Sequence, residues 1–191
     1  MEAADAVVFA SPGYMMNVTG IMKQFLDRVA YNCHRPRFFR QKALLVANSS
    51  QWATKETIKA MESFAGGSGF EIAGRLTTSY LPIPMRPEAV AKEDAKVEQM
   101  ADHLWDKLCT RAPRPPIGLG DLMQFAAMKH LSDKFPARCS ADHAFFSKIC
   151  ATGLRHWYVP VRIKPAALLM KTLMMPFVKS SMNKMFLYEE T

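Results

Sequence analysis

The sequence predicts an α/β protein with a parallel β-sheet, followed by a helical extension. Short, continuous apolar runs, typical of buried strands, alternate with segments whose apolar residues recur at helical spacing. Parallel neighbouring strands need a crossover between them, which is usually a helix, so this alternation indicates a doubly wound parallel sheet. After the proline-rich residues 111–116, the chain becomes rich in methionine and aromatic residues without a clear strand.

The first predicted strand covers residues 6–10, which are all apolar. The turn residues Ser11, Pro12 and Gly13 follow at once, so we expect the strand to run into a loop. Thr19 is placed to cap a helix. The apolar face of that helix is expected to consist of Ile21, Met22, Phe25, Leu26, Val29 and Ala30. A strand this apolar also predicts hydrogen-bonded neighbours on both of its sides.

The same pattern then repeats. A second strand is predicted at 43–47, and a helix with Ile58, Met61 and Phe64 on one face follows. We expect Gly66, Gly67 and Gly69 to end this helix. Strand character returns at 70–77, and a long helix is predicted at 88–109.

We therefore expect two parts, a sheet domain at 1–112 and a helical extension at 113–191. The sheet domain has 14 Lys and Arg residues against 12 Asp and Glu, whereas the extension has 11 against 5. Most of the net charge of +8 thus lies in the extension.

One segment of the extension predicts a helix with an apolar stripe. The stripe consists of Ala166, Leu169, Met170, Leu173, Met174, Phe177 and Val178. Two interpretations stay open: packing on the domain or on a second subunit, which we favour, and a weak membrane-surface contact of a basic helix with anionic lipid. We expect a homo-oligomer. We expect no nucleic-acid partner, because the basic residues are spread along the sequence and form no motif with aromatic residues.

Several function classes find no support in the sequence. The four cysteines and five histidines show no spacing typical of a metal site, a cluster or a catalytic triad, so we predict neither metal-binding nor catalytic side chains. The chain start does not resemble a secretory signal, and the longest apolar run contains Lys171. A cytoplasmic, reducing setting is the expectation.

The loop after the first strand is the most informative segment. In open parallel sheets, ligands bind beyond the carboxyl ends of the strands, and this loop lies at such an end. Pro12 and Gly13 favour a turn, Tyr14 offers an aromatic surface, and backbone amides near a helix start can donate to an electron-rich ring. Such a loop fits the edge of a flavin. Alternatively, Asn17 and Thr19 only cap the helix, and residues 48–51 form an ordinary polar loop.

The same segment resembles the flavodoxin-like NAD(P)H-dependent FMN oxidoreductases and their iron–sulfur flavoprotein relatives. The matching pattern is SPxY, here Ser11 to Tyr14, and then GxxKxFxDR, here Gly20 to Arg28. The cluster cysteines of the iron–sulfur members are missing. The resemblance implies FMN contacts, with one group in the first loop and one after the second strand: Ser11, Pro12, Gly13, Tyr14, Met15, Asn17 and Val18, and Asn48, Ser49, Ser50 and Gln51, with Trp52 as a weaker candidate.

By this resemblance the sheet is a partial flavodoxin-like sheet, and the family's first two βα units, including the phosphate-binding loop, are expected to be absent from this sequence. The implied function is electron transfer from NADPH or NADH through FMN to a quinone, a flavin or another small acceptor, impaired by loss of that loop. The alternative is a non-catalytic remnant of the fold that acts as an interaction or scaffold protein.

Overall fold

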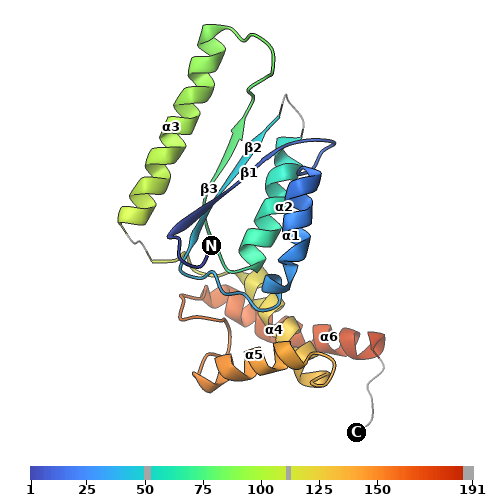
Figure 1. Ribbon diagram of the computed structural model, residues 1–191. Helices are drawn as coiled ribbons and strands as arrows, with labels where there is room; N and C mark the ends of the chain where they lie inside the picture. Colours follow the sequence, from blue (N-terminus) through green and yellow to red (C-terminus); the bar gives the residue numbers. More distant parts are fainter. Residues whose placement is uncertain (50–52, 111–112, 187–191) are drawn as a thin grey trace. The chain divides into compact units, whose positions relative to one another are not determined.

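The computed structural model describes residues 1–49, 53–110 and 113–186. The chain separates into two compact units, Met1–Ala112 and Pro113–Thr191, and each is described by itself (Figure 1).

The first unit is a three-layer α/β arrangement. Its strands are β1 (Ala6–Pro12), β2 (Lys42–Asn48) and β3 (Glu71–Thr78), all parallel and ordered β1-β2-β3. Its helices are α1 (Gly20–Arg28), the short 3-10 helix η1 (Ala30–Cys33), α2 (Thr54–Gly67) and α3 (Pro87–Cys109). The predicted α/β class and parallel sheet are confirmed.

The helices cover two opposite faces of this sheet. Phe9 of β1 is 4% exposed, and its ring contacts Phe25 of α1, Phe64 of α2 and Phe70, at centroid distances of 6.4, 5.8 and 5.5 Å. On the other face, α3 lies against β3 (Figure 1). Gly74 permits this approach, because a Cβ atom there would lie 2.4 Å from the Met100 Sδ.

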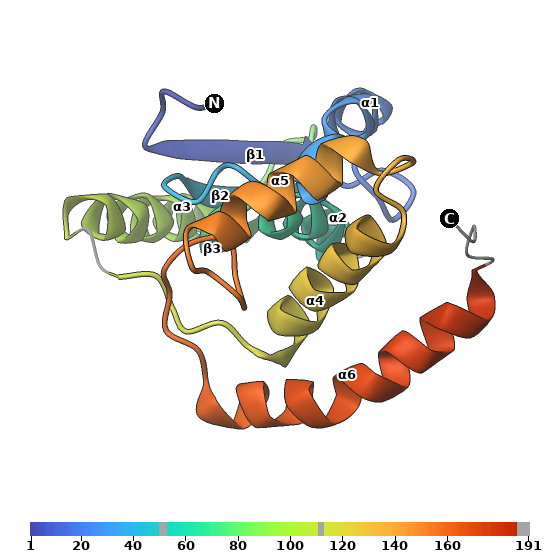
Figure 2. The same cartoon turned by 90° about the horizontal axis from the view of Figure 1, so that it is seen from below.

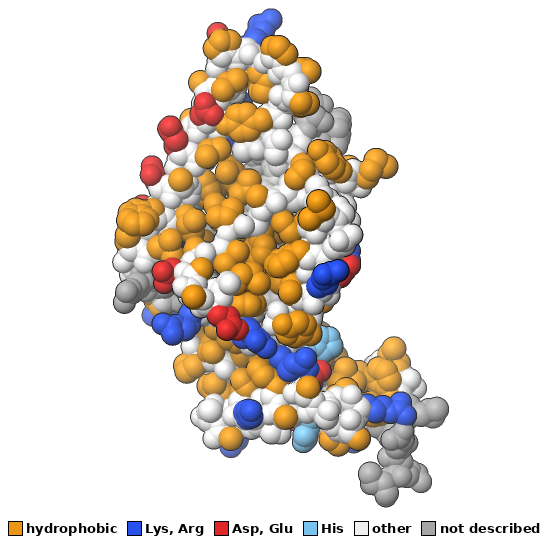
Figure 3. Space-filling model, in the orientation of Figure 1, with side chains coloured by type: hydrophobic (Ala, Val, Ile, Leu, Met, Phe, Trp, Pro, Cys, Tyr) orange, Lys and Arg blue, Asp and Glu red, His pale blue; other side chains and the backbone are white. Residues whose placement is uncertain are grey.

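The β1 strand is an edge strand in the described part of the sheet. It pairs with β2 alone, although its sequence predicts neighbours on both sides. Val8 is 54% exposed on the face away from α1 and α2, and Ala10 is exposed as well. Hydrophobic side chains are prominent on the face of the molecule drawn in Figure 3.

One local prediction in this unit was wrong. Ile21 was expected on the buried face of α1, but it is 83% exposed, and Leu26 with Met22 and Phe25 forms that face instead. The glycines expected to end α2 do mark its end, because the last residue of the helix is Gly67. The chain then turns at Gly69, whose φ of +102° glycine adopts without strain.

The second unit contains three helices: α4 (Leu119–Lys134), α5 (Ser140–Ala151) and α6 (Pro165–Met185), which Figure 2 shows from below. Its core is an aromatic cluster of Phe125, Phe146, Trp157 and Tyr158, each buried. The predicted helical C-terminal part is thus confirmed. In the described residues of the chain, no helix is both long and apolar enough to cross a membrane.

The packed face of α6 differs from the predicted stripe. Ala167 and Met175 are the buried residues of this helix, whereas Leu169, Leu173 and Phe177 are 62%, 58% and 79% exposed. The physical reason is that α6 has apolar residues on two sides, and the side with Met175 contacts α4. Pro176 lies inside this helix.

The central position of Phe9 gives a direct test. We expect Phe9→Ala to lower the free energy of unfolding by about 3–5 kcal/mol, because it removes a buried ring and leaves a cavity. Val8→Ala is the matched control, since its exposed side chain should change stability by less than about 0.5 kcal/mol. Urea unfolding of the three proteins provides the measurement, and equal losses in both variants would contradict the packing described.

Candidate functional site

The carboxyl ends of the three strands meet at one edge of the sheet, and backbone hydrogen bonds join the segments that follow them. The Gly13 N–H donates to the carbonyl oxygen of Asn48 at 2.9 Å, and the Ser49 N–H donates to that of Thr78 at 3.1 Å. The loops after β1, β2 and β3 are therefore one connected structure. This is the edge at which ligands bind in open parallel sheets.

Residues 14–17 form a tight hairpin at this edge. Tyr14 and Asn17 exchange two backbone hydrogen bonds of 3.0 Å, and Met15 and Met16 between them have φ angles of 48° and 62°. Two successive residues in the left-handed region are typical of a type I′ turn, which glycine and asparagine favour. A methionine in this region costs about 1 kcal/mol or more. The loop is thus held in a strained conformation.

Two other loop residues stabilise that conformation from inside. The Ser11 side chain is 4% exposed, and its hydroxyl accepts from the Thr19 N–H at 3.0 Å and donates to the Pro12 carbonyl. Val18 is 7% exposed and belongs to the hydrophobic core. Thr19 in turn caps α1 by accepting from the Met22 N–H, as its position in the sequence predicts.

The Asn48 side chain joins the ends of β2 and β3. Its Nδ2 donates to the Tyr80 carbonyl at 3.0 Å, and its Oδ1 accepts from the Tyr80 N–H and the Thr78 hydroxyl, both at 2.9 Å. Asn48 therefore fixes the position of the segment around Tyr80, which lies at the same edge of the sheet. The Tyr80 hydroxyl donates to Asp94 of α3, and this hydrogen bond, with smaller effects of burial and of nearby carboxylates, raises the pKa of Tyr80 to about 12.

Close contact between the first loop and the start of α2 completes the edge. A Cβ atom at Gly13 would lie 2.8 Å from that of Ala53, so only glycine fits there without movement. The Thr57 hydroxyl lies 3.2 Å from the Asn17 carbonyl and 2.6 Å from that of Ala53. Sequence reasoning missed Thr57 and Tyr80, because their roles depend on loops that meet only in the folded chain.

The exposed side chains of the first loop are uncharged, and one of them is aromatic. Tyr14 is 66% exposed, Met15 is 96% exposed, and Asn17 is exposed beside them, with its Oδ1 accepting from the Val18 N–H at 2.8 Å. Ser49 is half-buried, with its hydroxyl 3.5 Å from the Gly13 carbonyl. The predicted candidates Ser50 and Gln51, and the weaker candidate Trp52, lie outside the described residues.

These residues suit one portion of FMN. Residues 11–22 include no charged side chain, and the amides of Gly13, Tyr14 and Asn17 are bonded within the fold. The loop therefore offers a neutral surface with the Tyr14 ring, which fits the ring of a flavin rather than its phosphate. Within the described ranges, no group of three or more His, Cys, Asp or Glu residues is arranged to hold a metal ion.

The strained turn can be tested through stability. Because Met15 is almost fully exposed, Met15→Gly removes little packing and relieves an unfavourable φ, so we expect the free energy of unfolding to rise by about 0.5–1 kcal/mol. Met15→Ala keeps the strain and should leave stability unchanged. Thermal and urea unfolding measure both, and destabilisation by glycine would show that the backbone is not strained here.

Comparisons with known proteins find similarities over part of the chain. Residues 1–71 match the family model described as NADPH-dependent FMN reductase. A segment of 36 residues is 53% identical to an iron–sulfur flavoprotein of Archaeoglobus fulgidus, and it spans 19% of this chain and 16% of that relative's length.

Two solved structures are also similar, although neither similarity is close enough to assign this chain to a family. One is the WrbA-like flavodoxin protein from Agrobacterium tumefaciens (18% identity, 53% of this chain and 69% of that chain, TM-score 0.37). The other is the Trp repressor binding protein from Bacillus subtilis (18% identity, 51% and 63%, TM-score 0.39). The sequence similarity to the NADPH-dependent FMN reductase family thus covers residues 1–71, and the matched segment spans less than a fifth of the iron–sulfur flavoprotein's length.

Proposed function

We propose that this protein is an FMN-dependent oxidoreductase, with the loop after β1 against the isoalloxazine ring. The family match over residues 1–71 supports the cofactor and the use of NADPH or NADH as electron donor. The observation that carries the proposal is the strained hairpin that presents Tyr14, 66% exposed, at the carboxyl edge of the sheet. Strain of this kind in a non-glycine loop is a feature of ligand-binding sites.

The candidate residues would have two kinds of role. Tyr14, Met15 and Asn17 are exposed and would contact the ring. The remaining described candidates would fix the loops behind it: Ser11, Pro12, Gly13, Val18, Asn48 and Ser49. When bound, FMN supplies the redox chemistry, so the protein's task is to bind and orient the ring, and no acid–base side chain is required.

The acceptor in this proposal is a small molecule such as a quinone or another flavin. A specific observation favours the alternative of a non-catalytic interaction protein: Val8 of β1 and Leu173 of α6 are apolar and exposed. The absorbance spectrum of the purified protein distinguishes the two. The oxidoreductase should be yellow and bleach with NADPH or NADH, whereas an interaction protein should be colourless and bind no added FMN.

The proposed ring contact is tested with Tyr14→Ala. We expect FMN binding to weaken by about 1–3 kcal/mol, the scale of a lost aromatic contact. Tyr31→Ala is the matched control, because Tyr31 is also an exposed tyrosine, 49% accessible, but lies in η1. Fluorescence titration of FMN gives the dissociation constants, and an unchanged constant for Tyr14→Ala would remove Tyr14 from the site.

We also propose that α6 mediates homo-oligomerisation. The exposed residues Leu169, Leu173 and Phe177 lie on one side of the helix, and an apolar stripe of this length is a typical subunit contact. Association of two copies would remove these side chains from water.

The expected outcome is that Leu173→Asp shifts the protein to a smaller species, because a carboxylate would be buried without a partner in such an interface. Gln124→Asp, an equally acidic change at an exposed position of α4, should leave the mass unchanged. Sedimentation equilibrium measures both. The same mass for wild type and Leu173→Asp would rule out the stripe as the contact.

A further inference from the structure

The loop between β3 and α3, residues 79–85, carries apolar side chains that are exposed to solvent. Leu81 and Ile83 are 36% and 62% exposed, and Pro82 and Pro84 are exposed as well. These side chains add little to the core of the unit. Exposed apolar side chains that lie together are a feature of surfaces that bind another molecule.

The backbone at the start of this loop is held from two sides. Asn48 binds both the N–H and the carbonyl of Tyr80, as described above. From α3, the Glu93 carboxylate accepts from the Ser79 N–H at 3.2 Å. Glu93 is only 7% exposed and is paired with Lys96, so its position is fixed in turn.

The rest of the loop is restrained by its own residues. The Leu81 N–H donates to the Sδ of Met85 at 3.4 Å. The rings of Pro82 and Pro84 restrict two further φ angles. The exposed apolar side chains are therefore presented on a backbone that is ordered before any ligand binds, which lowers the entropic cost of binding.

This loop lies beside the proposed flavin loop. The Asn48 carbonyl accepts from the Gly13 N–H at 2.9 Å, while its side chain holds Tyr80. Tyr14 and Leu81 each follow a residue that bonds to Asn48, and both loops lie at the same end of the sheet (Figure 1). Strands β1 and β3 are two strand spacings apart, roughly 10 Å. A ligand at the end of β2 would thus have Tyr14 on one side and Leu81 on the other.

The charges around this position favour an uncharged ligand. Residues 11–22 and 79–85 include no Asp, Glu, Lys or Arg. Within the described residues, the charged side chains that bond to the second loop are the carboxylates of Glu93 and Asp94. They disfavour an acceptor that carries a phosphate or another negative charge. The first basic residue after this loop is Arg86, the N-cap of α3.

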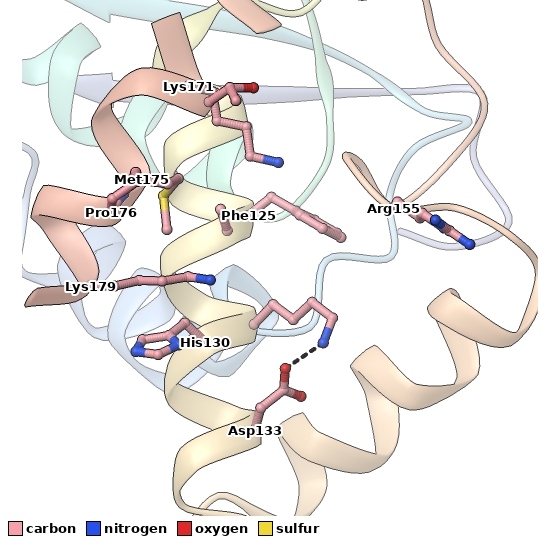
Figure 4. A pocket seen from close by; sticks show the side chains of 11 residues that line it. Phe125, His130, Asp133, Arg155, Lys171, Met175, Pro176 and Lys179 are labelled. Carbon is pink, nitrogen blue, oxygen red and sulfur yellow. Dashed lines mark hydrogen bonds and ion pairs between the residues drawn. The ribbon is translucent and has the colours of Figure 1, made fainter. Parts of the chain in front are cut away.

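The second unit offers a pocket of a different chemical kind. It has a volume of about 570 Å³ and lies between α4 and α6. Figure 4 shows Lys171 and Lys179 on α6, and on α4 Asp133, which is paired with Lys129. An uncharged ring would have to displace water from these charged groups without replacing its hydrogen bonds. The edge of the sheet therefore suits an uncharged acceptor better than this pocket does.

We propose that residues 79–85 form the acceptor side of the flavin site, and that Leu81 and Ile83 select an uncharged, apolar quinone over a second flavin nucleotide. This inference rests on the proposed oxidoreductase function. In the overall reaction NADPH gives a hydride and the solvent gives a proton. NADPH becomes NADP+, and the quinone takes up two electrons and two protons to become the hydroquinone.

The first test compares two acceptors on the full chain loaded with FMN. Menadione is an uncharged, apolar quinone, and ferricyanide is an inorganic anion that needs no apolar contact. We expect Ile83→Ser to raise the KM for menadione by about tenfold, through loss of an apolar contact. The KM for ferricyanide and the dissociation constant of FMN should stay unchanged. Leu81→Ser should act in the same direction.

Val97→Ser is the matched control. Val97 is also an exposed β-branched residue, 39% accessible, but it lies in the middle of α3. Its replacement should leave both KM values unchanged. Because Ile83 is exposed, its replacement is not expected to unfold the chain, and urea unfolding of each variant checks this.

A second readout does not depend on turnover. In NMR spectra of the FMN-loaded chain with labelled isoleucine methyl groups, the Ile83 signal should shift in a saturable way as menadione is added. The signal of Ile72, which lies at the opposite end of β3, should not move.

The outcomes separate this inference from the function on which it rests. A wild-type chain that binds no FMN, or that does not oxidise NADPH, would overturn the proposed function and this inference with it. A chain that reduces ferricyanide with NADPH, but whose KM for menadione is unchanged in Ile83→Ser, would overturn this inference alone. Equal increases in KM for both acceptors, or an unmoved Ile83 signal, would overturn it as well.

Discussion

The packing of Phe9 is the contact on which the first unit depends. In the described sheet β1 has hydrogen bonds to β2 alone. The backbone groups on its other side therefore do not help to fix the strand in the sheet. The contacts of Phe9 with Phe25, Phe64 and Phe70 tie the strand to α1, α2 and the start of β3. Since the candidate flavin loop begins where β1 ends, the position of that loop depends on this aromatic packing.

The loop itself combines strain with internal support. The unfavourable backbone of Met15 and Met16 persists because the residues on either side are fixed: Ser11 and Val18 are buried, and the Tyr14 and Asn17 backbones bond each other. Such a loop is formed before a ligand arrives. A preformed surface loses less conformational entropy on binding than a mobile one, which is an advantage for holding a planar ring.

Much of the fold could be predicted because its signals are local. Apolar runs mark β1 and β2, helical spacing marks α3, and Thr19 caps α1 as expected. What could not be predicted depends on contacts between distant segments. The sequence shows Asn48 as a polar residue after a strand, but its bonds to Tyr80 and Thr78 exist only because β2 and β3 are neighbours. Likewise, periodicity shows that α6 is apolar, but which of its two apolar sides is packed depends on the shape of α4.

Pro176 introduces a point inside α6 at which the helix can bend. A proline has no amide hydrogen, so the Thr172 carbonyl, four residues earlier, lacks its usual helical partner, and helices bend most readily at such points. This point lies between Lys171 and Lys179. A bend of α6 at this point would change the separation of the two ammonium groups.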